Sequence, residues 1–126
     1  MSGLTTQIGN RGEDAAVEWL RERGYYIVER NWRAGSYEID IIAQHFDTMH
    51  FVEVKTRRDS IQAPPQYNVD RAKQSRITKA ALGFLHDRKD LRMDNHECYF
   101  DVVAITFSGD SYCTEWFPQA YIPIYL

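Results

Sequence analysis

Two runs of β-branched and aromatic residues near the middle of the chain alternate with polar positions. They span Ile39 to Ala43 and Phe51 to Thr56, and polar residues that include Asp47 and Thr48 separate them. Alternation with a period of two, interrupted by a short polar segment, is typical of a β-hairpin. The pattern therefore predicts two antiparallel strands at this point of the chain.

This hairpin is expected to bring Asp40, Glu53 and Lys55 together, because side chains alternate between the two faces of a strand. On the first strand, the predicted faces are Glu38, Asp40 and Ile42 against Ile39, Ile41 and Ala43. On the second strand, they are Phe51, Glu53 and Lys55 against Val52 and Val54, which point into the core. A turn near Phe46 and Asp47, or one residue later, places Asp40 opposite Glu53 or opposite Lys55. Two carboxylates and one ammonium then converge on a single patch.

The patch has two interpretations. It can be the solvated face of a half-exposed hairpin, in which an ion pair between Asp40 and Lys55 contributes little stability. Alternatively, Asp40 and Glu53 offer the oxygen ligands that Mg²⁺ or Mn²⁺ prefers, and Lys55 can orient or deprotonate a water molecule beside the ion.

Helical periodicity marks two further segments. From Ile8 to Arg23 apolar residues recur at helical spacing, and Gly24 follows where a C-terminal cap is expected. A second helix is predicted from about Asp70, a good N-cap, to about His86. Its buried stripe consists of Ile77, Ala80, Ala81, Phe84 and Leu85. Lys73 and Gln74 flank this stripe near the helix start, so they can point toward the sheet edge that holds the carboxylates.

Glu13 lies on the apolar face of the first helix, because the residues three, four and seven positions later share that face. Its carboxylate would then point to the interior, where it needs a partner. The alternative is a capping role, since Asn10 and Glu13 have capping-box spacing. Gly9 and Gly12 would let another backbone or a phosphate approach this helix closely.

Three more strands are predicted from aromatic and β-branched runs, at residues 25–32, 99–107 and 112–117. The second of these is apolar almost throughout, which is typical of a strand buried on both faces. Asp101 near its start is expected to be a structural hydrogen-bonding group. Residues 57–68, which include two prolines, and residues 88–95 are predicted loops, the first of them beside the site.

The chain length allows one hydrophobic core. Its 126 residues with 44% hydrophobic content are too few for two cores, so we expect one domain over 1–126 with a tail from about 118 to 126. The start of the chain lacks signal-peptide features and no apolar run reaches the length of a membrane span, which predicts a cytoplasmic protein without membrane contact. Cys98 and Cys113 show no ligand spacing, so reduced core cysteines are expected instead of zinc ligands or a disulfide.

The formal net charge of −3 is unusual for a protein that binds nucleic acid. It does not exclude DNA as a partner, because the local field matters more than the total and a divalent ion would offset the charge of the carboxylates. The basic residues also cluster. The cluster is Arg57, Arg58, Arg71, Lys73, Arg76 and Lys79.

Several segments match a known family in their order along the chain. They are Gly12-Glu13-Asp14-Ala15-Ala16, Gly24-Tyr25, Arg30-Asn31-Trp32-Arg33, Glu38-Ile39-Asp40, Phe51-Val52-Glu53-Val54-Lys55-Thr56-Arg57, Lys73-Gln74 with Arg76-Ile77, and Phe100-Asp101-Val102-Val103-Ala104. In combination they resemble the YraN-like bacterial proteins over nearly the whole chain. That family is similar to the archaeal Holliday-junction resolvases of the PD-(D/E)XK superfamily.

The resemblance implies a restriction-endonuclease-like mixed β-sheet flanked by helices, with the order α-β-β-β-α-β. It implies a Mg²⁺-dependent or Mn²⁺-dependent endonuclease acting on structured or branched DNA. The positions carried over as catalytic are Glu13, Asp40, Glu53 and Lys55, and those carried over as metal ligands are Asp40, Glu53, the carbonyl of Val54, and Glu13 at a second ion or a metal-bound water.

Two further positions carry over less directly, and two features depart from the family. Lys73 or Gln74 falls where relatives place an auxiliary helix residue. Tyr37 stands where the family usually has glycine, which is expected to alter access to the site. The aromatic tail is the second departure.

Two other functions fit the same residues. A nucleic-acid-binding scaffold would keep the carboxylates and bind DNA with a marked salt dependence, but would not cut it. A protein-interaction module that uses the aromatic tail would show no salt-dependent DNA binding. Resolution of a four-way junction requires two paired sites, which makes a homodimer a further expectation of the enzyme interpretation.

Overall fold

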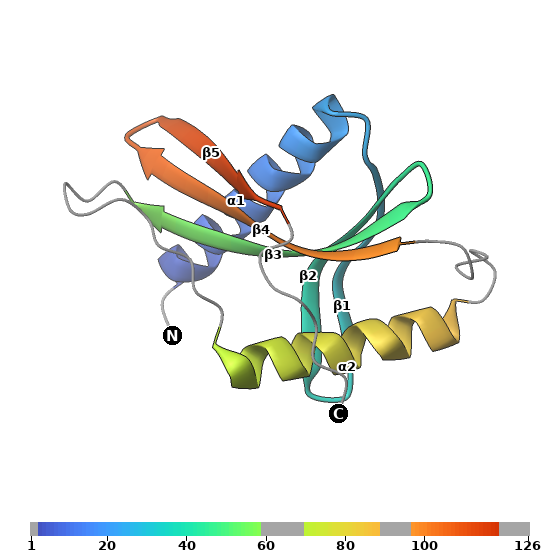
Figure 1. Ribbon diagram of the computed structural model, residues 1–126. Helices are drawn as coiled ribbons and strands as arrows, with labels where there is room; N and C mark the ends of the chain where they lie inside the picture. The colour runs from blue at the N-terminus through green and yellow to red at the C-terminus, as the bar shows by residue number, and fades with distance from the viewer. Residues whose placement is uncertain (1–2, 59–69, 89–96, 119–126) are drawn as a thin grey trace.

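The described residues form a five-stranded mixed sheet with one helix on each face (Figure 1). The computed structural model describes residues 3–58, 70–88 and 97–118, with side chains from Asn10 onward. The elements are α1 (Gly3–Glu22), β1 (Tyr26–Ala34), β2 (Tyr37–His45), β3 (Thr48–Arg58), α2 (Arg71–Asp87), β4 (Glu97–Ser108) and β5 (Ser111–Phe117). The predicted fold class and element order are confirmed, with β5 as the final edge strand. Most of the two predicted loops, 57–68 and 88–95, and the tail from 119 lie outside the described residues.

α1 ends at its predicted cap, Gly24, and α2 begins at its predicted cap, Asp70. α1 starts earlier than expected, at Gly3, and ends in a Schellman motif at Gly24, whose φ is +87°. In this motif the Tyr25 N–H donates to Leu20 O and the Gly24 N–H to Arg21 O, both at 3.0 Å. At the start of α2, the Asp70 carboxylate accepts the Lys73 N–H at 2.8 Å.

The strands lie in the order β1-β2-β3-β4-β5, and only the β3–β4 pair is parallel. The β2–β3 turn is Phe46 and Asp47, with His45 opposite Thr48. α2 carries the chain from the end of β3 back to the start of β4, which a parallel pair requires. β3 and β4 are consequently central strands, and this explains why their apolar residues face helices on both sides.

The core consists of two clusters separated by the sheet. The α1 cluster joins Ala16, Val17 and Leu20 to sheet residues such as Val52 and Val103. The α2 cluster joins the helix stripe to the opposite sheet face, with contributors that include Ile77, Phe84, Ile39, Ile42 and Phe51. The hairpin face that carries Phe51 is therefore covered by α2, and the expectation of a solvated face is wrong.

Three sequence expectations about single residues differ from the structure. Ile39 packs in the α2 cluster whereas Ile41 packs in the α1 cluster, so they do not share a face. Cys98 is half-buried but Cys113 is exposed on β5 and does not lie in the core. The group that approaches Gly12 most closely is the Thr56 side chain of β3, and not another backbone.

Among the described helices, none has a stretch that is long and apolar enough to cross a membrane.

Candidate functional site

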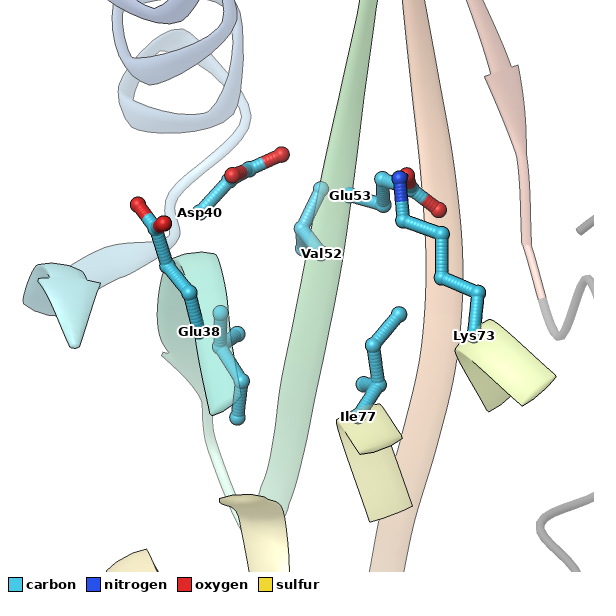
Figure 2. Close-up of a pocket in the computed structure, with 7 residues that line it drawn as sticks. Glu38, Asp40, Val52, Glu53, Lys73 and Ile77 are labelled. Atoms are coloured by element: carbon cyan, nitrogen blue, oxygen red, sulfur yellow. The ribbon is translucent and has the colours of Figure 1, made fainter. Parts of the chain in front are cut away.

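A pocket of about 140 Å³ opens where β2 and β3 separate. Its lining residues are Glu38, Ile39, Asp40, Val52, Glu53, Lys73 and Ile77. The backbone pairing of the two strands ends at Ile41 opposite Val52, one position before Asp40 and Glu53. The first of the two predicted registers is therefore the one formed. Figure 2 shows the Lys73 side chain extending from α2 to the Glu53 carboxylate on β3.

The Asp40 side chain forms a hydrogen bond to β3 at the point where the backbone pairing of β2 and β3 has ended. Its Oδ2 accepts the N–H of Val54 at 2.8 Å. Burial raises the pKa of Asp40, and the hydrogen bond from Val54 only partly offsets this. Repulsion from the carboxylates of Glu13, Glu53 and Glu38 also raises it, and the net result is a pKa of about 6. The site therefore concentrates negative charge around Asp40, which favours a cation.

Glu53 is the most buried charged residue of the pocket, with 6% of its surface exposed. Its Oε1 lies 3.1 Å from Lys55 Nζ and also contacts Lys73 Nζ. Its Oε2 is buried and has no hydrogen-bond partner among the described residues. A buried carboxylate oxygen without a partner is costly in a folded protein unless a ligand or water completes it.

Of the two candidate auxiliary residues, Lys73 reaches the site. Burial opposes the charge of Lys73, but its hydrogen bond to Glu53 and the attraction of Glu53 and Asp40 outweigh this effect and raise its pKa. Gln74 is half-buried one position later on α2 and is not part of the pocket lining. Of the two, Lys73 is therefore the residue that lies against the Glu53 carboxylate.

Glu13 faces the sheet and does not cap a helix, because α1 begins ten residues before it. Its side chain is 17% exposed. The Asn31 Nδ2 donates to Glu13 Oε1 at 3.0 Å, and Arg30 lies 3.5 Å from the same oxygen. Arg30 also pairs with Asp14 at 2.9 Å. Glu13 is thus held between β1 and the site, close enough to Asp40 to raise its pKa.

The predicted DNA-contacting residues lie around the pocket and do not line it. Arg57 is half-buried and donates through Nε to Thr106 at 3.3 Å, whereas Arg58 is exposed at the end of β3. Arg71, Arg76 and Lys79 are exposed on α2. The end of β3 and the start of α2 lie on the same side of the molecule (Figure 1).

Sequence reasoning missed a buried pair of polar residues at the other end of the hairpin. His50 Nδ1 lies 2.6 Å from Asp101 Oδ2, and Nε2 lies 2.9 Å from the Thr48 hydroxyl. The same hydroxyl donates to His45 O at 2.7 Å. Asp101 has the predicted structural role. His50 gave no signal because its partner is 51 residues away in the chain.

Asn31 is the second residue that sequence reasoning did not assign to the site. It holds Glu13, and its φ is +52° in the middle of β1. A positive φ is uncommon outside glycine, although asparagine tolerates it better than most residues. The only signal in the sequence was its position inside the Arg30-Asn31-Trp32-Arg33 motif.

The residues present fit a divalent ion of the magnesium type. No three acidic, histidine or cysteine side chains in the described part of the chain enclose an ion by themselves. Mg²⁺, however, is commonly held by one or two carboxylates with waters and other oxygens. Asp40 with its raised pKa and the unpartnered Oε2 of Glu53 are two such carboxylates.

The fold and site define a class of protein, a mixed α/β domain whose two-helix, five-strand arrangement is consistent with a nuclease-like fold. The model of "Uncharacterised protein family UPF0102" matches residues 12–105. The chain belongs to this family, which is the YraN-like family that its motifs resemble. The matched segment includes every proposed catalytic position.

Relatives of this chain are similar over most of their length. A UPF0102 protein of Geobacter metallireducens is 42% identical over 121 residues, which cover 96% of this chain and 97% of the relative. One from Geotalea uraniireducens is 49% identical over 98 residues, covering 78% and 75%. One from Treponema pallidum is 46% identical over 99 residues, covering 78% and 76%.

Proposed function

We propose that this protein is a metal-dependent endonuclease that hydrolyses phosphodiester bonds in structured or branched DNA. We further propose that it belongs to the PD-(D/E)XK superfamily, beside the archaeal Holliday-junction resolvases. One observation carries the proposal: Glu53 is a buried carboxylate with one oxygen on two lysines and the other unpartnered, next to Asp40 in a pocket. A purely structural ion pair has no need of a second buried carboxylate beside it.

In the proposed site, Asp40, Glu53 and the carbonyl of Val54 would hold Mg²⁺ or Mn²⁺, and Glu13 would bind a second ion or a water molecule on the first. When bound, the ion stabilises the negative charge that develops on the scissile phosphate. Asp40 must be ionised to act as a ligand, so its raised pKa sets a lower pH limit for metal binding.

Lys55 positions the attacking water in this proposal. Its ammonium lies 3.1 Å from Glu53 Oε1, and the side chain is 35% exposed, so it contacts the carboxylate and remains accessible to solvent. Lys73 approaches the same oxygen from α2 and is placed to offset charge on a phosphate oxygen. Two lysines on one carboxylate keep that carboxylate in place while the substrate binds.

DNA is the proposed partner, and the basic residues near the pocket, of which Arg57 is half-buried and the others exposed, would contact its phosphates. These are Arg57, Arg58, Arg71, Arg76 and Lys79. Phosphate contacts position a duplex without reading its sequence. A cytoplasmic location accompanies this proposal. Resolution of a four-way junction would require a homodimer, because two strands are cut at two paired sites.

A second candidate, a nucleic-acid-binding scaffold that does not cut, is favoured by the two ammonium groups on Glu53 Oε1. These already supply positive charge at the place where an ion would bind. The third interpretation, an interaction module based on the aromatic tail, concerns residues outside those that the structure describes.

Metal titration and cleavage assays on Glu53→Gln and Lys55→Ala test the enzyme proposal. We expect calorimetry to show that the wild type binds Mg²⁺ and Mn²⁺. In the cleavage assay, we expect the wild type to cut at least one of four substrates: a four-way junction, a flap, single-stranded DNA or duplex DNA. Glu53→Gln should lose metal binding and cleavage. Lys55→Ala should keep metal binding and cut about 10²- to 10⁴-fold more slowly. Both variants should fold. In Glu53→Gln the two lysines lose their charged partner, but each is more than a third exposed and can turn to solvent.

The matched control is Glu115→Gln, which removes one negative charge from an exposed position on β5. It should behave as the wild type. Cleavage that persists in both site variants would exclude the mechanism, whereas salt-dependent DNA binding without any cutting would establish the scaffold.

A further inference from the structure

Asn31 lies where the alternation of side chains between the two faces of the sheet is interrupted, both on β1 and on its neighbour β2. Arg30 on β1 contacts α1 residues, yet Trp32 packs on Phe84 of α2, with ring centroids 5.5 Å apart. Residues two positions apart share a face in a regular strand. The same exchange occurs on β2, where Ile41 belongs to the α1 cluster and Ile39 to the α2 cluster.

The residues between these pairs are Asn31 and Asp40. Arg30 lies opposite Ile41 and Trp32 opposite Ile39, so the register brackets Asn31 and Asp40 at equivalent positions of β1 and β2. The positive φ of Asn31, +52°, is the only one within β1. A left-handed residue in a strand breaks the alternation of faces and re-aims the neighbouring side chains.

At the equivalent position of β2, the Asp40 carboxylate reaches toward β3. There it accepts the Val54 N–H at 2.8 Å instead of projecting from one face. The Asn31 side chain acts separately on Glu13, because a carboxylate only accepts and the amide must donate its N–H, at 3.0 Å. One residue on β1 thus bears on two carboxylates of the site, one through its backbone and one through its amide.

We propose that Asn31 is a positioning residue of the site: its left-handed backbone directs Asp40 toward β3, and its amide holds Glu13. The backbone part stands on the fold alone. The part that concerns Glu13 and the metal rests on the proposed function. Backbone outliers of this kind are retained where the surrounding structure requires them, and they cluster at functional sites.

Two substitutions separate the two roles. Asn31→Gly removes the amide but permits the positive φ, and Asn31→Ala removes the amide and disfavours that φ. The position of Asp40 is read from the Val54 amide proton in a ¹H–¹⁵N spectrum without metal, because a hydrogen bond to a carboxylate moves this resonance downfield. Mg²⁺ and Mn²⁺ affinity is measured by calorimetry. Phe46→Ala is the control, since Phe46 also has a positive φ, +55°, but lies in the β2–β3 turn.

We expect Asn31→Gly to leave the Val54 resonance unchanged and to weaken metal binding about tenfold, as loss of an outer-sphere partner does. Asn31→Ala should move the Val54 resonance upfield and weaken metal binding by a larger factor. Phe46→Ala should change neither. A merely structural Asn31 would alter the melting temperature but not the metal affinity of the glycine variant.

The outcomes distinguish this inference from the proposed function. If the Val54 resonance is the same in Asn31→Ala as in the wild type, the backbone role of Asn31 is wrong. If the wild type binds metal and Asn31→Gly binds it equally well, the role of the amide is wrong. If the wild type binds no metal while Asn31→Ala still shifts the Val54 resonance, the metal site fails and the positioning of Asp40 stands.

Discussion

Asparagine in place of Asp40 should stabilise the folded protein by up to about 3 kcal/mol at pH 8, and should make little difference near pH 4. The reason is that burial and neighbouring carboxylates raise the pKa of Asp40 from 3.8 to about 6. Asparagine keeps an oxygen that can accept the Val54 N–H but carries no charge. The gain therefore measures the free energy that the ionised carboxylate costs the fold.

The sign follows from proton linkage. Between about pH 4 and pH 6 the folded state binds a proton at Asp40 that the unfolded state has lost. The contribution of Asp40 to stability therefore falls as the pH rises through this window, and it is constant above it. Asparagine does not titrate, so the difference between the two proteins should grow from pH 4 to pH 6 and then stay level.

Urea unfolding at several pH values, in the presence of a chelator, measures this effect. Asp110→Asn, at an exposed position in the β4–β5 turn, is the matched control and should change stability little at any pH. Adding Mg²⁺ at pH 8 should stabilise the wild type but not Asp40→Asn, since only the former has both ligands. Equal stability of the two proteins at pH 8 would contradict the raised pKa of Asp40.

Alanine in place of Gly12 should destabilise the protein by about 3 kcal/mol or more. A Cβ at this position would lie 2.0 Å from Thr56 Oγ1 and 3.0 Å from Thr56 Cβ. Neither group can move away easily, because Thr56 is part of β3 in the centre of the sheet. α1 would have to shift away from the strand that also carries Glu53 and Lys55.

The other helix offers a control with the opposite sign. A Cβ on Gly83 in α2 would meet Trp32 at 3.5 Å and Ala34 at 3.7 Å, which are ordinary contacts. Gly83→Ala should therefore stabilise the protein by about 0.5 to 1 kcal/mol through helix propensity. Thermal unfolding of both variants provides the comparison.

The double variant Gly12→Ala, Thr56→Ala should recover part of the loss. A Gly12→Ala protein as stable as the wild type would mean that α1 does not pack this closely on β3.

Asp40 illustrates why a functional site is often not optimised for stability. The three other carboxylates around Asp40 all disfavour its ionised form. Proteins retain such arrangements where function needs them, and stabilising substitutions are then available at the site itself. A stabilising Asp40→Asn that also abolishes metal binding would show this relation directly.

Local signals in the sequence were sufficient to predict the elements and part of the site. Gly24 and Asp70 mark helix ends because capping is decided by a few adjacent backbone groups. The two-residue turn at Phe46 and Asp47 fixes the register of β2 and β3, so the approach of Asp40 to Glu53 was predictable from the alternation of polar and apolar residues. Helical periodicity had directed Glu13, Lys73 and Gln74 toward the sheet, and the resemblance to the family assigned roles to Glu13 and to Lys73 or Gln74.

The sequence by itself determined the order of the elements, the central hairpin and the identity of the charged groups at its open end, because these depend on neighbours along the chain. Only the tertiary structure decided that Glu53 is buried, since α2 covers that face after the crossover between β3 and β4. It also decided that Lys73 reaches Glu53, that Asn31 holds Glu13, and that His50 pairs with Asp101. These contacts join residues from 18 to 51 positions apart, and they form only when packed helices fix the distance between strands and helix faces.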